Sequence, residues 1–115
     1  MADFFKVSEA VTVRVVELDL PAALDVDEFD KLNASLLAEF REKDGRWILD
    51  LSKVDYVGSA MLGLMVNIRQ HVKSVAGKLV LCGLSPRLLE IFKACCMERL
   101  FVITRSRADA VKKLA

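Results

Sequence analysis

The stretch from Ile48 to Leu64 constrains the fold of this chain more than any other. It begins with the apolar run Ile-Leu-Asp-Leu, which is typical of a β-strand, and continues through a short loop to Gly58-Ser59. Beyond that pair, apolar residues recur at intervals of three and four, which places them on one face of an α-helix that can be buried. The apolar positions are Met61, Leu64, Met65, Ile68, Val72 and Val75. The pattern predicts a strand, a loop and a helix, with Ser59 where the loop becomes the helix.

Ser59 has two interpretations at such a junction. A serine hydroxyl at a helix start can accept a hydrogen bond from a free amide of the first turn, and such a cap contributes about 1 kcal/mol. A phosphate on the same oxygen would add roughly −1.5 to −2 charges and would lie in the positive field of the helix start. The residues leave both interpretations open. Ser52, at the end of the predicted strand, is a weaker candidate for phosphorylation.

The remaining segments predict alternating strands and helices. Val11–Val16 alternates like a strand, Phe4 and Phe5 suggest a short edge strand, and Pro21 falls in the connection that follows. Asp25 or Asp27 is expected to cap a helix that runs to about Glu42. The later elements are predicted as a strand over 47–51, a helix stop at Gly77, a strand over 78–82, a helix over 87–97 after the cap Ser85, a strand over 100–103, and a last helix capped by Ser106 and anchored by Val111 and Leu114. This alternation predicts an α/β fold with parallel pairs, to which the early strands add antiparallel pairing.

The central junction and the order of the elements resemble the STAS domain, the fold of the anti-sigma factor antagonists, also called anti-anti-sigma factors. The signature of that family is an apolar strand ending in Asp-Leu, a few loop residues, and Asp-Ser-Ser/Ala-Gly-Leu-Gly at a helix start. Here the junction reads Gly58-Ser59-Ala60-Met61-Leu62-Gly63, in which the serine, the leucine and the last glycine match. Gly58 replaces the family's aspartate and Met61 replaces its first glycine. Glu17-Leu18-Asp19 also resembles the family's connection after an early strand.

The resemblance covers roughly 11–111 and implies a small mixed β-sheet of about four to five strands, with about four helices mainly on one face. It also implies a regulatory binding module and not an enzyme. The unmodified domain would bind an anti-sigma factor with serine kinase activity and so free a sigma factor, and phosphorylation of Ser59 would end the binding. The ATP would belong to the kinase, so we expect no cofactor on this chain.

By this analogy the partner covers the loop and the helix start, from Asp55 to Met65, with residues Asp19 to Leu24 alongside. The expected contact residues are Asp19, Asp55, Gly58, Ser59, Ala60, Met61, Leu62 and Met65. Gly58 offers no carboxylate beside the serine, and Asp55, three residues earlier, is the candidate to substitute for one. The alternative is therefore a STAS module that binds a transporter ATPase or a signalling assembly without a phosphorylation switch. Gly63 is interpreted as a close-packing residue in preference to a low surface for a partner.

Composition excludes several other classes of protein. The 115 residues predict a single domain spanning 1–115, and 54% hydrophobic against 29% charged residues argues against disorder. The net charge of +1 does not suggest a nucleic-acid or membrane surface, and the C-terminal basic residues are expected to form a solvated face: Arg99, Arg105, Arg107, Lys112 and Lys113. No run approaches the ~20 apolar residues of a bilayer span, and the N-terminus lacks signal-peptide features, so a cytoplasmic location is expected.

The sequence also lacks the groups of residues that form catalytic or metal-binding sites. The three cysteines are Cys82, Cys95 and Cys96, and without metal-ligand spacing they are expected to be reduced and mostly buried. The single histidine, His71, falls late on a predicted helix, and the sequence contains neither a nucleophile elbow nor a Gly-rich phosphate loop. A phosphoaspartate receiver would need an acidic pair and a lysine at strand ends, and this combination is missing. The sequence therefore favours a binding module over an enzyme.

Overall fold

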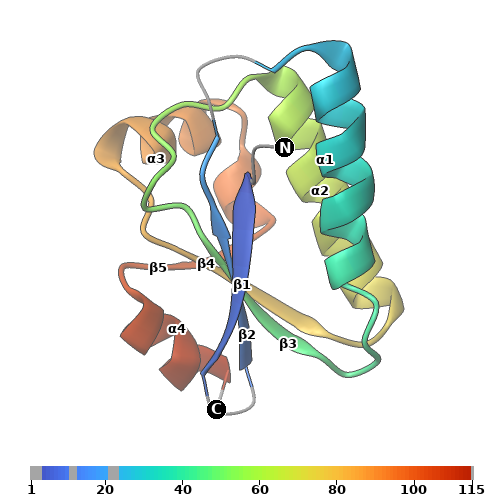
Figure 1. Ribbon diagram of the computed structural model, residues 1–115. Coiled ribbons are helices and arrows are strands. Elements are labelled where there is room, and N and C mark those ends of the chain that lie inside the picture. The colour runs from blue at the N-terminus through green and yellow to red at the C-terminus, as the bar shows by residue number, and fades with distance from the viewer. Residues whose placement is uncertain (1–3, 11–12, 21–23, 115) are drawn as a thin grey trace.

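The computed structural model of the protein describes residues 4–10, 13–20 and 24–114. Its centre is a five-stranded sheet in the order β1-β2-β3-β4-β5 (Figure 1). The strands are β1 (Phe5–Ala10), β2 (Val13–Leu18), β3 (Arg46–Asp50), β4 (Lys78–Cys82) and β5 (Val102–Thr104). β1 runs antiparallel to β2, and the other neighbouring pairs are parallel. The predicted mixed sheet is confirmed, whereas Val11, Thr12 and Pro21 lie outside the described residues.

Helices cover the two faces of this sheet unequally. They are α1 (Val26–Glu39), α2 (Ser59–Ser74), α3 (Pro86–Ala94), the short 3-10 helix η1 (Met97–Arg99) and α4 (Arg107–Leu114). Figure 1 shows α1 and α2 side by side against one face, whereas α4 lies on the other side of the sheet. Asp25 caps α1 as expected, but α1 ends before Glu42 because Phe40 leaves the helix and packs on Trp47, with ring centroids 5.4 Å apart.

The larger core lies between the sheet and the layer of α1, α2 and α3. The apolar stripe predicted for α2 is confirmed, since its residues are buried from Met61 to Val72 at the expected positions. Leu32 and Leu36 of α1 face the same core. Burial of this apolar surface provides most of the force that holds α2 in place, and α2 begins at the predicted functional serine.

A smaller core lies under α4 on the opposite face of the sheet. It contains Val13 and Val15 of β2, Ile48 of β3, and residues of β4 and α4. Leu114 is buried there as predicted, but Ala110 takes the place expected for Val111, which is only partly buried. Because side chains alternate along a strand, Glu17 and Asp50 share this face with Val15 and Ile48. The two acids are register partners at the carboxyl ends of β2 and β3.

Gly77 does not end α2 in the way that its position suggested. The residue in the left-handed conformation is Ala76, with φ 56°. Its amide donates to the carbonyl of Lys73, and the Gly77 amide donates to the carbonyl of Val72, which completes the helix end. Gly77 is needed for space, because a Cβ there would lie 2.7 Å from the ring of Trp47 and 2.9 Å from a backbone oxygen. The expected helix stop is therefore correct in place but not in mechanism.

The expectation of mostly buried cysteines is wrong for two of the three. Cys82 is buried in β4, but Cys95 and Cys96 are exposed. α3 ends at Ala94, three residues before the expected end, and Cys96 adopts a left-handed conformation with φ 56° and ψ 24°. That turn directs Met97 into the core, where a cysteine was expected. β5 begins at Val102, later than predicted, and Phe101 before it packs on Phe92.

Candidate functional site

The loop between β3 and α2 is anchored at both ends. The Leu51 amide donates to the carbonyl of Cys82 at 2.9 Å, and the Val54 amide donates to the Leu51 carbonyl at 3.0 Å. Val54 and Val57 are buried in the larger core, so the loop is fastened by apolar contacts as well as hydrogen bonds. Between these anchors the chain exposes Asp55 and Tyr56. The loop therefore presents a few side chains from a fixed backbone.

A network of charged groups under this loop connects it to α4. The Arg107 Nε donates to Asp50 Oδ2 at 2.5 Å, and its Nη2 donates to Glu17 Oε2. Glu17 also pairs with Lys53 at 2.8 Å, and Asp50 Oδ1 accepts from the Ser52 amide at 2.9 Å. The expectation that Arg107 belongs to a solvated basic face is therefore wrong. As the first residue of α4, it lies above the two register-paired acids and, together with Lys53, balances their charge.

The electrostatics of the network follow from these contacts. Burial alone would raise the pKa of Asp50, but the hydrogen bonds from Arg107 and Ser52 and the charge of Arg107 outweigh it, so its pKa is lowered. The hydrogen bond from Lys53 is the main reason that the pKa of Glu17 is also lowered. Burial, reinforced by the nearby charge of Asp50, raises the pKa of the Cys82 thiol to about 11. Cys82 is thus a neutral core residue and not a reactive thiolate.

Ser59 lies at the surface, as the first residue of α2. The N-cap is Gly58, with φ −87° and ψ 179°, and among the described residues no side chain accepts a hydrogen bond at this helix start. The interpretation of Ser59 as the cap is therefore wrong, because capping belongs to the residue before the first helical one. The first intrahelical bond runs from the Leu62 amide to the Gly58 carbonyl at 3.1 Å. The earlier amides of the first turn remain available to an acceptor.

Restoring an acidic cap should be possible without strain. A Cβ at Gly58 would meet no described atom within 4 Å, and the backbone there is extended, which any residue adopts. We expect Gly58→Asp to raise the free energy of unfolding by about 0.5–1 kcal/mol, through a side-chain cap and a favourable charge at the helix start. Urea denaturation followed by circular dichroism measures the change. Gly58→Ala serves as the control, since it adds a Cβ without a cap, and an equal gain from alanine would contradict the explanation.

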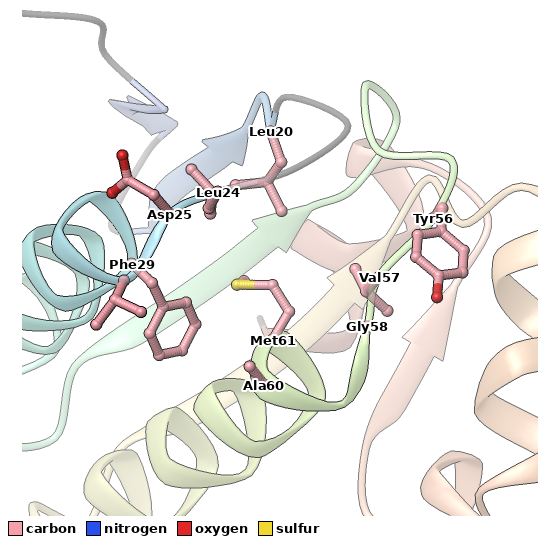
Figure 2. A pocket seen from close by; sticks show the side chains of 10 residues that line it. Leu20, Leu24, Asp25, Phe29, Tyr56, Val57, Gly58, Ala60 and Met61 are labelled. Atoms are coloured by element: carbon pink, nitrogen blue, oxygen red, sulfur yellow. The ribbon is translucent and has the colours of Figure 1, made fainter.

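A groove of about 380 Å³ opens beside Ser59 between the starts of α1 and α2. One wall consists of residues 20, 24–26 and 29, and the other of residues 56–58, 60 and 61. Figure 2 shows Phe29 and Met61 projecting into the space between the two helices, with Leu20 and Leu24 on one side and Val57 on the other. Ser59 itself does not line the groove, but its neighbours Gly58 and Ala60 do. Most of the lining is apolar, as in sites that bind ligands or partner side chains.

The structure separates the predicted contact residues into two groups. The first group is exposed or half-exposed and can contact a partner: Asp19, Asp55, Gly58, Ser59, Ala60 and Leu62. Met61 is nearly buried and reaches the surface only as a groove wall. Met65 is 0% exposed, so its assignment to the contact surface is wrong. The reason is the helical period, which turns Met65 toward the sheet one turn after Met61.

Sequence reasoning missed several residues of this surface. Leu20 and Leu24 belong to the segment expected alongside the contact surface, but Val26 and Phe29 come from the start of α1, where an apolar stripe alone gives no indication of a groove. Tyr56 is 57% exposed, and the Arg87 guanidinium lies 5.6 Å from the centre of its ring. Arg87 also contacts Asp55 at 3.4 Å, which connects the loop to α3. The one available signal was an aromatic residue in a polar loop, since tyrosine is frequent at protein interfaces.

Gly63 is also not a close-packing residue. It is exposed, and a Cβ there would meet no described atom within 4 Å. The interpretation favoured from the sequence is therefore wrong. Glycine in a helix costs up to about 1 kcal/mol relative to alanine, and contacts within the described chain do not explain that cost.

Neither metal chemistry nor a membrane span is indicated over the part of the chain that the structure describes. Within these residues no group of three or more histidine, cysteine, aspartate or glutamate side chains could hold a metal ion. Among them there is also no helix with the length and apolarity that crossing a bilayer requires.

Comparisons with known proteins agree with this architecture. A model of the STAS domain family matches residues 6–110. The chain is 33% identical over 81 residues to BtrV of Bordetella bronchiseptica, which is provisionally named an anti-sigma factor antagonist, and the match covers 70% of each chain. A STAS domain protein of Planctomyces limnophilus, described as an anti-sigma factor antagonist, superposes with a TM-score of 0.81 at 22% identity and covers 96% of this chain and 97% of that one. The Bacillus cell fate determinant SpoIIAA in its phosphorylated form gives 0.65 at 15% identity, with 96% and 99% covered.

Proposed function

This chain belongs to the STAS domain family, and we propose that it is an anti-sigma factor antagonist switched by phosphorylation of Ser59. In its unmodified form it binds an anti-sigma factor that has serine kinase activity. Transfer of phosphate to Ser59 then ends the binding. The name of the Bordetella relative and the phosphorylated form of SpoIIAA support a role of this kind.

Ser59 gives the strongest support for the proposal. Its side chain is exposed at the first residue of α2, where a kinase can reach it. A phosphate there would meet the free amides and the positive end of the helix dipole, so the fold can accept the modification. The neighbouring residues Gly58 and Ala60 line the groove, so a partner that covers the groove also covers Ser59.

The same geometry explains how phosphorylation would release a partner. In the bound state the phosphate would lose much of its water beside apolar groove residues such as Ala60 and Met61. An ionised group without a compensating partner is costly to desolvate. Each 1.4 kcal/mol of that cost weakens binding about tenfold, so a cost of a few kcal/mol is enough for a switch.

A second function is favoured by Gly58. The family's aspartate is missing beside Ser59, and Asp55, the candidate to replace it, is paired with Arg87 at 3.4 Å. If kinase recognition needs that carboxylate, the chain would be a STAS module that binds a transporter ATPase or a signalling assembly without being modified. The two functions share the groove and differ only at Ser59.

A pull-down from the source cell tests both functions. The unmodified chain and Ser59→Ala are expected to retain an anti-sigma factor, whereas Ser59→Asp should weaken its binding by about tenfold or more. Ser35→Asp is the matched control, because Ser35 is an exposed serine of α1 that does not line the groove. Mass spectrometry after incubation with the captured kinase and ATP should find phosphate on Ser59. Binding that is equal in all variants, with Ser59 unmodified, would contradict the switch and support the second function.

A further inference from the structure

The groove between α1 and α2 has apolar side chains at its surface as well as in its depth. Val26, the first residue of α1, is 76% exposed on one wall, and Tyr56 is more than half exposed on the other. Single exposed apolar side chains are common, but exposed apolar side chains that adjoin an apolar groove form a contiguous patch, which marks an interaction site. Figure 2 shows Phe29 of one wall and Met61 of the other projecting into the space between the helices, so the apolar surface continues into the groove.

Acidic side chains gather on the α1 side of the groove, whereas on the other side Arg87 lies over Tyr56 and is paired with Asp55. Asp25 lines the groove, and Asp27 and Glu28 follow it in the first turn of α1. Asp19 is exposed on the segment that leads to this helix. No lysine or arginine is found among the described residues that line the groove. The wall on the α1 side is therefore apolar with an acidic edge, and the wall on the α2 side has no charged lining residue.

We propose that the groove receives a large apolar side chain from a basic segment of the partner protein. In this arrangement lysine or arginine side chains of that segment meet the carboxylates of Asp25, Asp27 and Glu28. The carboxylates extend over a turn of α1 beyond the groove itself, which fits several cations on a chain better than one small ligand. The proposal rests on the proposed function for the identity of the partner, an anti-sigma factor.

Both walls are ordered before a partner binds. The Glu28 amide donates to Asp25 Oδ1 at 2.7 Å, and the Asp25 amide donates to Glu28 Oε1 at 3.3 Å, so the acidic turn is held in a reciprocal cap. Across the groove, Arg87 lies over the ring of Tyr56 and contacts Asp55. Side chains that are already positioned lose less conformational entropy on binding, which favours affinity.

The separation of charge also agrees with the phosphorylation switch. Ser59 lies beside the α2 wall, because its neighbours Gly58 and Ala60 line that side. The partner's cations would meet the opposite wall on α1. A phosphate on Ser59 would therefore be placed against the apolar part of the partner, where desolvation opposes binding.

Selection from a random-peptide phage library on the immobilised full chain tests the proposal without a known partner. Enriched peptides are expected to combine a large apolar residue with neighbouring lysine or arginine. Their affinity, measured by fluorescence anisotropy, should fall about fivefold with Asp25→Asn, which removes a charge but keeps an equally good helix cap. Ala60→Glu should reduce it about tenfold by filling the groove, and glutamate is well tolerated in a first helical turn.

Two variants serve as matched controls. Asp44→Asn makes the same change in the turn after α1, where asparagine tolerates the left-handed φ of 58°. Asn67→Glu places the same side chain as Ala60→Glu on an exposed part of α2 that does not line the groove. Neither should alter peptide binding. Enrichment of acidic or uncharged peptides, no enrichment at all, or indifference to Asp25→Asn would overturn the proposal.

The same variants separate this inference from the proposed function. If the captured anti-sigma factor binds Asp25→Asn and Ala60→Glu as well as the unmodified chain, the groove proposal fails and the proposed function stands. If basic peptides bind in the groove but the chain captures no anti-sigma factor, the proposed function fails and the groove proposal stands as a docking site for another basic partner.

Discussion

Replacing Arg107 with alanine is expected to lower the free energy of unfolding by about 3 kcal/mol. The variant leaves Asp50, which is only 4% exposed, as a buried carboxylate without its cation. Breaking a buried ion pair typically costs about 3–5 kcal/mol, and the lower end applies because the Arg107 side chain is 43% exposed. Thermal unfolding followed by circular dichroism should show a fall in Tm of roughly 12 °C.

Two further variants identify the cause. Arg105→Ala removes an exposed arginine two residues earlier and should change stability by less than about 0.5 kcal/mol. Adding Asp50→Asn to Arg107→Ala should recover part of the loss, since a neutral amide needs no cation and can still accept from the Ser52 amide. A double variant less stable than Arg107→Ala would contradict the account based on an unpaired charge.

The effect of Arg107→Ala should also depend on pH. The pKa values of Asp50 and Glu17 are lowered in the folded chain. Their contribution to stability is therefore complete above their unfolded pKa values, near about 4, and is lost as the pH falls through the folded values. The difference between the unmodified chain and Arg107→Ala should be largest near neutral pH and should narrow below about pH 4, because a protonated Asp50 needs no cation.

Two neighbouring residues after α2 should respond in opposite directions to single substitutions. We expect Gly77→Ala to lower the free energy of unfolding by about 2–3 kcal/mol, because the new Cβ would overlap the buried Trp47 ring and a backbone oxygen. Ala76→Gly should raise it by up to about 1 kcal/mol, since glycine adopts a φ of 56° without strain.

Urea denaturation of both variants measures these changes. If Gly77 were needed only as a flexible helix stop, Gly77→Ala would cost little and the near-ultraviolet signal of Trp47 would not change. A loss from Ala76→Gly would contradict the explanation from backbone strain. Together the two variants separate two requirements at a helix end. Ala76 adopts the left-handed backbone conformation, and Gly77 leaves room for Trp47, whereas the sequence alone suggested that Gly77 ended the helix.

Much of the fold could be predicted because it depends on local patterns. The spacing of apolar residues in α2 and the caps Asp25 and Ser85 each concern a few consecutive residues, whereas β2 does not alternate as expected, because Val16 and Leu18 are buried on its other face. Such patterns decide whether a segment becomes helix or strand and which of its faces is buried. The position of Ser59 at the start of α2 followed from the same reasoning.

The candidate site was predictable only in part. The exposed serine, its neighbour Ala60 and the segment 19–24 could be named from the resemblance, but Val26 and Phe29 of α1 also line the groove and no local pattern indicated it. Met65 was assigned to the surface because a motif is a string of residues, whereas burial depends on the direction in which each side chain leaves the helix.

The sequence by itself determined the order of strands and helices, the buried stripe of α2 and the place of Ser59, because hydrophobic periodicity and capping act between residues close in the chain. Only the tertiary structure decided that Arg107 pairs with Asp50 and Glu17, that Gly77 makes room for Trp47, and that residues around α1 complete the groove beside Ser59. These outcomes depend on contacts between residues far apart in the chain. Such contacts are set by how the sheet and its two helical layers pack, and not by any local pattern.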